Sequence, residues 1–209
     1  MLTLDQFKKL VSDFSLNSQN RVLCAKHLEL LYVHYEQLCH WNQTHKLCAL
    51  SNTADDVYNH YCDSLMGRNL LQNEKSIYDA GSGAGFPGIV LATIGGDQKF
   101  HLVELIRKKA SFLNFTKEKM RLENVTVCNT GIENFQNLAC VISRAAFTPD
   151  FQKSLAQVIM PGGHIYSWLS ETQQSLMEGA CNFVKEEEIH YKLPNGKSRR
   201  IECWRKKLV

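Results

Sequence analysis

The segment Asp79-Ala-Gly-Ser-Gly-Ala-Gly-Phe-Pro-Gly88 predicts a tight turn between a strand and a helix. Gly81, Gly83 and Gly85 stand at alternate positions, which suits a backbone that takes positive φ or approaches a ligand closely. Apolar residues before the segment predict the end of a buried strand, and those after it predict a helix over Pro87–Ile94. The free N–H groups at the start of that helix can receive a negatively charged group.

An acidic residue supports a nucleotide-like ligand in this turn. Glu104 ends the next apolar run, where a neighbouring parallel strand would bring a carboxylate to ribose hydroxyls. The glycine order is G-x-G-x-G, because the position of the third glycine in the dinucleotide fingerprint G-x-G-x-x-G is held by Phe86. This order is typical of class I S-adenosylmethionine (AdoMet) methyltransferases. It makes a dinucleotide oxidoreductase the least favoured function for this chain. A purely structural turn and a solvated Glu104 remain the alternatives.

Composition is ordinary for a soluble globular protein. The 209 residues are 44% hydrophobic and 22% charged, with a net charge of +3. The chain has neither a membrane-length apolar run nor a secretory signal, so its eight cysteines are expected to be reduced thiols. A cluster of possible zinc ligands has no standard zinc-module spacing, and we expect no metal there; its members are Cys39, His40, His45 and Cys48.

Residues 1–75 predict a helical extension, and residues 76–209 predict an α/β domain, both within one compact unit. In the extension, Asn17 or Ser18 is expected to cap a long helix that ends near Trp41, and Thr53 to begin a second helix. In the domain, strand and helix patterns alternate, which favours a parallel sheet. The expected strands are Ile77–Ala80, Phe100–Glu104, Val125–Cys128, Cys140–Ser143 and His164–Trp168. The expected helices are Pro87–Ile94, Arg107–Leu122, Pro149–Met160 and Glu171–Phe183.

The chain ends in an expected antiparallel hairpin, Glu187–Leu193 and Arg199–Arg205, with Asn195-Gly196 as its turn. The predicted fold class is therefore α/β: a Rossmann-like class I methyltransferase sheet with a C-terminal antiparallel hairpin and an N-terminal helical extension.

Several segments together resemble the bacterial 16S rRNA (guanine-N7) methyltransferase family RsmG, also called GidB. They are Trp41-Asn42, His60-Tyr-Cys-Asp63-Ser64, the glycine turn, Lys108-Lys109 with Phe112-Leu113, and Ile142-Ser143-Arg144-Ala145. The resemblance covers about residues 25 to 204 and implies methyl transfer from AdoMet to N7 of a guanine in the decoding-region loop. It also implies 16S rRNA or the small ribosomal subunit as partner, and a monomeric cytoplasmic enzyme. Three departures from the family pattern are Gly131, Leu169-Ser170 and Lys46-Leu47-Cys48.

The resemblance also implies roles for single residues. Asp79 would brace the turn, and His60 and Asp63 would hold the N-terminal helices over the site. Arg144, the candidate catalytic residue, would hold the cofactor carboxylate or bond guanine O6, with a surface salt bridge as the alternative. Phe147 would stack on the base or pack in the core. The expected cofactor contacts are Asp79, Gly81, Gly83, Gly85, Phe86, Glu104, Ile132, Glu133 and Arg144, and the expected RNA contacts are Lys108, Lys109, Arg199 and Arg200.

The expected chemistry needs no general base, because guanine N7 has a lone pair and no proton to lose. Positioning and the reactivity of the cofactor can supply the rate. Two basic clusters, residues 105–121 and the C-terminal hairpin, would neutralise phosphates, although solvated surfaces explain them equally well. The remaining alternatives are a small-molecule or protein methyltransferase and an AdoMet-binding, RNA-associated protein with an altered substrate or no turnover.

Overall fold

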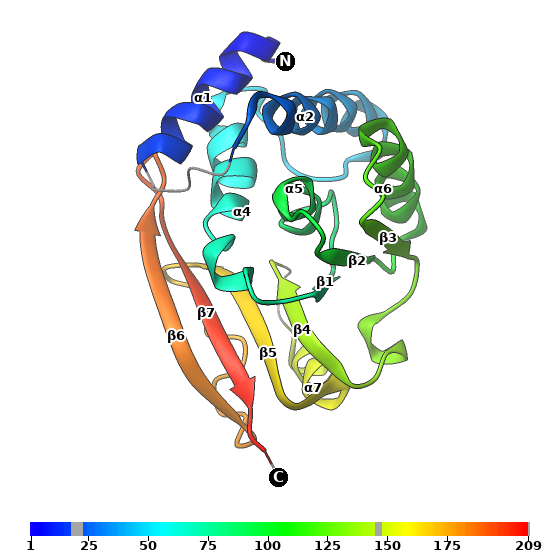
Figure 1. The fold of residues 1–209 in the computed structure, drawn as a ribbon, viewed down its shortest axis with the longest axis vertical. Coiled ribbons are helices and arrows are strands. Elements are labelled where there is room, and N and C mark those ends of the chain that lie inside the picture. The colour runs from blue at the N-terminus through cyan, green and yellow to red at the C-terminus, as the bar shows by residue number, and fades with distance from the viewer. Residues whose placement is uncertain (18–22, 145–147, 209) are drawn as a thin grey trace.

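The computed structural model describes residues 1–17, 23–144 and 148–208. Its centre is a seven-stranded sheet with the order β3-β2-β1-β4-β5-β7-β6 (Figure 1). Strands β1 to β5 pair in parallel, and β7 runs antiparallel between β5 and β6. The bounds are Ser76–Ala80 (β1), Lys99–Val103 (β2), Val125–Cys128 (β3), Leu138–Ser143 (β4), Ile159–Ser170 (β5), Phe183–Lys192 (β6) and Ser198–Lys206 (β7). The predicted parallel sheet with a terminal hairpin is confirmed.

Helices cover the two faces of the sheet unequally (Figure 1). One face carries α1 (Leu4–Asn17), α2 (Ala25–His45), α5 (Gly88–Ile94) and α6 (Arg107–Met120), together with a continuous helical segment over residues 54–65. That segment is α3 (Ala54–Asp56), the π-helix η1 (Val57–Cys62) and α4 (Asp63–Leu65), followed by the short 3-10 helix η2 (Asn69–Leu71). The other face carries α7 (Pro149–Val158) and the 3-10 helix η3 (Ile132–Asn134). No helix in the described ranges has the length and apolar character needed to cross a membrane.

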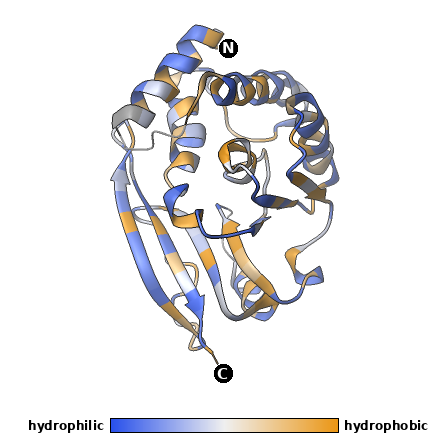
Figure 2. Cartoon of the chain, in the orientation of Figure 1, coloured by the Kyte–Doolittle hydropathy of each residue, from blue (hydrophilic) through white to orange (hydrophobic). Residues whose placement is uncertain are grey.

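The strands separate two apolar cores. The larger core joins the N-terminal helices, α5 and α6 to one face of the sheet, through residues such as Tyr35, Tyr61 and Phe112. The smaller core lies under α7 and contains Val141, which points away from its neighbours Cys140 and Ile142 in the larger core. Figure 2 shows apolar residues concentrated on α5 and β4, while the outer strand β6 is largely polar.

Two predicted helices differ in the structure. The expected helix from Asn17 to Trp41 begins instead at Ala25, because Asn17 ends α1 and the N–H of Cys24 bonds Nδ1 of His27 at 3.3 Å. Ser18, the other expected cap, lies outside the described residues. No helix forms over the predicted range Glu171–Phe183, every residue of which is described. The Arg200 side chain donates hydrogen bonds to the carbonyls of Glu171 and Gln173, and Gly179 has a φ of 79°.

The cap at Thr53 is confirmed, since its side chain accepts a hydrogen bond from the N–H of Asp55. Strand β5 starts at Ile159, earlier than the predicted His164, and its pairing with β4 shifts register there. The carboxyl ends of β1, β2, β4 and β5 meet at one edge, where ligands bind in open parallel sheets.

Candidate active site

The glycine turn follows β1 and uses its three glycines differently. Gly81, Gly83 and Gly85 have φ values of 77°, 58° and 93°. A Cβ atom on Gly83 would have only a carbonyl oxygen, 3.8 Å away, as its neighbour, so the backbone there faces open space. A Cβ on Gly85 would instead lie 2.9 Å from Ile89 and 3.1 Å from His34. Gly83 therefore lets a ligand approach the turn, whereas Gly85 lets the protein pack behind it.

Asp79 braces this turn from beneath. Its side chain is fully buried, and Oδ2 accepts the N–H of Gly88 at 3.0 Å. Burial raises the pKa of Asp79 from 3.8 to about 7, against the opposing effect of the Gly88 hydrogen bond. This geometry agrees with the bracing role. The other expectation for Asp79, a contact with the cofactor, stays a prediction, and its side chain has no exposed surface.

Glu104 joins the turn to β2. Its Oε2 accepts the N–H of Gly83 at 2.8 Å, and its Oε1 accepts the N–H of Ile106 at 2.7 Å. The carboxylate thus lies against the open part of the turn, where the ribose contact was predicted. Beside it, Leu105 and Ile106 are 71% and 46% exposed, an apolar pair that the sequence analysis missed. Two apolar residues directly after Glu104 are the sequence signal that could have indicated an apolar surface beside the predicted ribose contact.

The pair expected beside the adenine lies on η3. Ile132 is buried in the smaller core, while Glu133 is exposed. The Glu133 carboxylate folds over Gly131, so that a Cβ atom at Gly131 would collide with it. The Ile132 side chain packs into the core, and the predicted place of this residue beside the adenine stays a prediction. The predicted role of Glu133 is untouched by this geometry.

Phe86 lies behind the turn in a cluster of aromatic rings. It is 5% exposed and stacks on His60, with ring centroids 4.8 Å apart. His34 is fully buried at the same place, and its Nε2–H donates to the Ala84 carbonyl at 2.9 Å while Nδ1 accepts the Tyr61 hydroxyl at 2.7 Å. Burial lowers the pKa of His34 to about 4, so the ring is neutral. The N-terminal helices therefore support the cofactor turn directly, which the sequence did not indicate.

Arg144 follows β4 and is held by the helical extension. Its Nη1 donates to the Asn59 carbonyl at 2.8 Å and to Oδ2 of Asp63 at 3.0 Å. Its Nη2 donates to Nδ1 of His60 at 3.1 Å, and the guanidinium lies 5.1 Å from the centre of the Phe86 ring. Burial, with Arg144 as the second cause, lowers the pKa of His60 to about 4. The structural role predicted for His60 and Asp63 takes a specific form here, since both position Arg144.

A cavity of about 410 Å³ opens beside Arg144 at the same sheet edge. Its wall joins distant parts of the chain: residues of the helical extension, the end of β5, and Lys197 and Arg199 of the hairpin. Asp63 ties them together, because it also accepts the Tyr191 hydroxyl at 2.8 Å and lies 3.8 Å from Nε of Arg199. The cavity is large enough for a planar base, and positively charged side chains line part of it.

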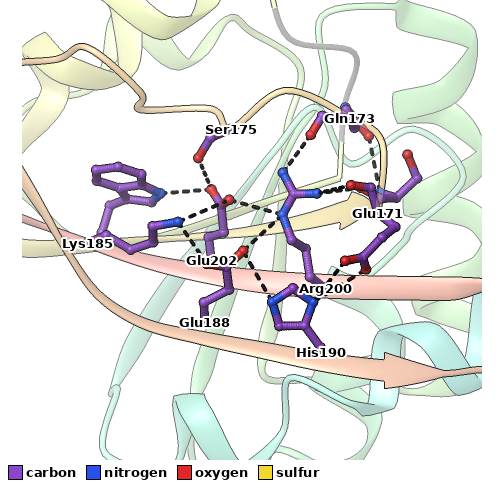
Figure 3. Close-up of polar contacts among 10 residues, drawn as sticks. Glu171, Gln173, Ser175, Lys185, Glu188, His190, Arg200 and Glu202 are labelled. Carbon is purple, nitrogen blue, oxygen red and sulfur yellow. Dashed lines mark hydrogen bonds and ion pairs between the residues drawn. The ribbon is translucent and has the colours of Figure 1, made fainter.

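Arg200, predicted to contact RNA, is 8% exposed and lies in the middle of a cluster of polar partners that includes Glu188 and Glu202 (Figure 3). Its Nε lies 3.1 Å from both Glu188 and Glu202, and its Nη1 and Nη2 donate to backbone carbonyls of Ser170, Glu171 and Gln173. The RNA-contact prediction for Arg200 is therefore wrong, because the guanidinium is enclosed by partners within the protein. Arg200 instead fixes the segment after β5 that lines the cavity.

The other predicted RNA contacts remain accessible. Arg199 has 21% of its side chain exposed and lines the cavity, and Lys108 is exposed in the first turn of α6 beside the half-buried Lys109. Leu169 is buried at the end of β5, so a buried apolar residue stands where the family pattern has a basic one. Phe147 lies outside the described residues.

The four possible zinc ligands do not form a common site. Cys39 is buried and its thiol points to Asn52, while the His45 ring lies 5.3 Å from that of Trp41. In the described ranges, no group of three or more His, Cys, Asp or Glu side chains is arranged to hold a metal ion.

Comparisons with known proteins agree with this geometry. A family model described as rRNA small subunit methyltransferase G matches residues 27–201. A protein of that class from Aliarcobacter butzleri, named ribosomal RNA small subunit methyltransferase G, is 30% identical over 186 residues, which cover 88% of this chain and 93% of the relative. A relative of the same name from Fusobacterium nucleatum is 41% identical over 95 residues, covering 45% of this chain and 41% of its own.

The fold is also found in solved structures. A SAM-dependent O-methyltransferase from Thermotoga maritima superposes with a TM-score of 0.52 at 16% identity, covering 70% of this chain and 65% of that one. At this identity the likeness shows the class I methyltransferase fold alone. The family match spans most of the chain and includes the glycine turn, Glu104 and Arg144. The chain therefore belongs to the rRNA small subunit methyltransferase G (GidB) family.

Proposed function

We propose that this protein transfers a methyl group from AdoMet to N7 of a guanine in 16S rRNA, in the decoding-region loop of the small subunit. The observation that carries the proposal is the shared edge of the sheet: the open glycine turn after β1 and the Arg144 cavity after β4 lie at carboxyl ends of adjacent strands. A cofactor in the turn and a base in the cavity would meet there.

The turn fits AdoMet. Gly83 leaves room for close approach of a ligand, Glu104 offers a carboxylate at the position of ribose hydroxyls, and Leu105 and Ile106 present apolar surface for the adenine. When bound, AdoMet supplies an electrophilic methyl group on its sulfonium, so the protein needs only to orient the acceptor.

The cavity fits an acceptor that has no proton to lose. Among its described residues, His60 is a poor base, because its pKa is lowered to about 4 and its Nδ1 accepts a bond from Arg144. Asp63 already accepts bonds from Arg144 and Tyr191. Methylation at N7 requires alignment and a donor to the base, and Arg144 can bond guanine O6 while the methyl group approaches N7.

We propose 16S rRNA or the small ribosomal subunit as the partner of a cytoplasmic monomer. Lys108, Lys109 and Arg199 would contact phosphates around the target, which gives salt-dependent binding. The competing function is an AdoMet-binding, RNA-associated protein without turnover. The altered basic positions, Gly131 and Leu169, motivate that alternative.

The test is methyl transfer from labelled AdoMet to small subunits isolated without this modification, followed by nucleoside mass spectrometry. One 7-methylguanosine in the decoding-region loop of 16S rRNA is the expected result. AdoMet binding in calorimetry without methyl transfer to the subunit, to 16S rRNA or to assembly precursors would contradict the proposal and favour the binding protein.

A further inference from the structure

Three aromatic rings form an exposed surface where the C-terminal end of α2 meets α6. We call Trp41, His45 and Phe115 the aromatic platform. The Trp41 ring lies 5.3 Å from His45 and 5.5 Å from Phe115, each at an interplanar angle of 45°. Phe115 is 38% exposed and His45 is exposed, whereas Trp41 is partly covered and rests on the buried Phe112 ring at 5.7 Å. The platform is thus anchored from below and open above.

Positive charge surrounds the aromatic platform. The Lys119 ammonium lies 5.5 Å from the centre of the Phe115 ring, and the exposed Lys46 follows His45 directly. Helix α6 has five basic residues, and its one acidic residue, Glu118, lies 3.7 Å from Lys117. The stretch of α2 from Gln37 to His45 contains no acidic residue. Exposed aromatic rings within a basic surface fit single-stranded nucleic acid, whose bases stack while its phosphates meet the cations.

The aromatic platform is connected to the cavity by one short segment. Asn42 holds the backbone of Cys48 with both of its side-chain groups, at 2.9 and 3.1 Å. The next residue, Ala49, lines the cavity and bonds His60. Residues 46 to 49 span at most about 11 Å. This segment connects the platform to the cavity wall, so a single-stranded stretch whose target base occupies the cavity could continue toward the platform.

We infer that the aromatic platform stacks an unpaired base of the single-stranded RNA that carries the target nucleotide, with Lys46 and Lys119 at its phosphates. The inference rests on the proposed function for the identity of the target base only. Stacking predicts that the ring of Phe115 matters, and not merely its apolar bulk against Trp41. Replacing the ring by an aliphatic side chain should therefore weaken RNA binding while the fold persists.

The experiment measures fluorescence anisotropy of a labelled RNA hairpin whose loop carries the 16S decoding-region sequence. In Phe115→Leu we expect the Kd to rise about fivefold or more, whereas Phe115→Trp should bind as the wild type does. Val184→Ala, which truncates a 41% exposed residue on β6 at the far side of the sheet, is the matched control and should leave the Kd unchanged. AdoMet affinity should be the same in all variants.

A second readout uses the fluorescence of the protein's own tryptophans. Trp168 lines the cavity and Trp204 is 9% exposed, so the part of the RNA-induced quenching that Trp41→Phe removes reports the aromatic platform. Unchanged tryptophan emission at saturating RNA, or a Phe115→Leu variant with wild-type Kd, would overturn the inference. RNA binding that is lost equally in Val184→Ala would overturn it as well. Because these readouts need no turnover, an inactive protein with a ring-dependent Kd refutes the proposed reaction and leaves the aromatic platform standing.

Discussion

The turn after β1 and the cavity after β4 lie at one edge of the sheet but are built in opposite ways. The turn is made of near neighbours: Asp79 bonds Gly88 nine residues away, and Glu104 bonds Gly83 across 21 residues. The cavity joins distant residues, since Arg144 bonds Asn59 and Asp63 across 85 and 81 residues and Tyr191 reaches Asp63 across 128. The local turn suits a constant cofactor, whereas the cavity proposed for the target base depends on residues from distant parts of the described chain.

This difference has a consequence for mutations. A substitution in the turn should act on cofactor binding through a few residues, whereas a substitution in the cavity wall propagates into the helical extension and the hairpin. The following expectations separate the two regions.

The largest effect is expected for Arg200→Ala, behind the cavity. This change leaves Glu202, which is 1% exposed, without its arginine and frees three backbone carbonyls. Breaking a buried ion pair in this way costs about 3–5 kcal/mol, measurable as the free energy of unfolding in urea. Its neighbour Arg199 is the control, because Arg199→Ala removes one long ion pair, at 3.8 Å from Asp63, and should cost much less stability than Arg200→Ala while weakening RNA binding. Equal stability of the two variants would contradict the enclosed position of Arg200.

Asp79→Asn tests the brace beneath the turn through pH. The pKa of Asp79 is raised from its ordinary value of 3.8 to about 7 in the folded protein. Between pH 3.8 and pH 7, the folded state therefore keeps a proton that the unfolded state has lost. This contribution lowers the stability of the wild type as pH rises through the window and is constant above it. From pH 5 to 7, the wild type should lose about 2 kcal/mol relative to Asp79→Asn. The variant retains His34 and His60, whose contributions cancel in the difference, and a flat difference would refute the raised pKa.

Gly83→Val tests the open side of the turn. A β-branched residue at a φ of 58° is strained, and its side chain would enter the space that Gly83 leaves to a ligand. We expect the calorimetric Kd for AdoMet to rise about 100-fold or more, since a loss of about 3 kcal/mol corresponds to that factor. The fold should persist, because the added Cβ makes one ordinary contact, with a carbonyl oxygen at 3.8 Å, and no clash. Unchanged AdoMet affinity would refute the placement of the cofactor.

The sequence was informative where contacts are local, and less so where they are not. Apolar runs and glycines predicted the strands, the turn and the hairpin, because each depends on neighbouring residues. The absent helix at Glu171–Phe183 and the enclosed Arg200 share one cause, the guanidinium that bonds the carbonyls after β5. Arg199 and Arg200 are adjacent in β7 and must face opposite sides, but which side holds the cavity is set by pairing with β5.

The sequence did not predict that the helical extension supports the site, because the contacts that do so join distant residues. His34 lies 50 residues from the Ala84 carbonyl that it bonds, and no spacing rule connects a histidine on a helix to a glycine turn that far along the chain. His60 and Asp63 were recognised by resemblance only, and their hold on Arg144 required the three-dimensional arrangement.

The smallest effect is expected for Arg144→Ala. This variant tests whether Arg144 contacts the target base in the cavity or the cofactor in the turn. If Arg144 serves the target base, the variant should lose between about 5- and 150-fold in turnover of rRNA, the range for one bidentate contact to guanine, with unchanged AdoMet affinity. If it instead holds the cofactor carboxylate, AdoMet affinity should fall in proportion. Arg144→Lys is the matched variant, because it keeps the charge toward Asp63 and removes the planar fork that recognises guanine. A loss shared by Ala and Lys variants in rRNA turnover alone assigns the planar group, and hence the cavity, to recognition of the base.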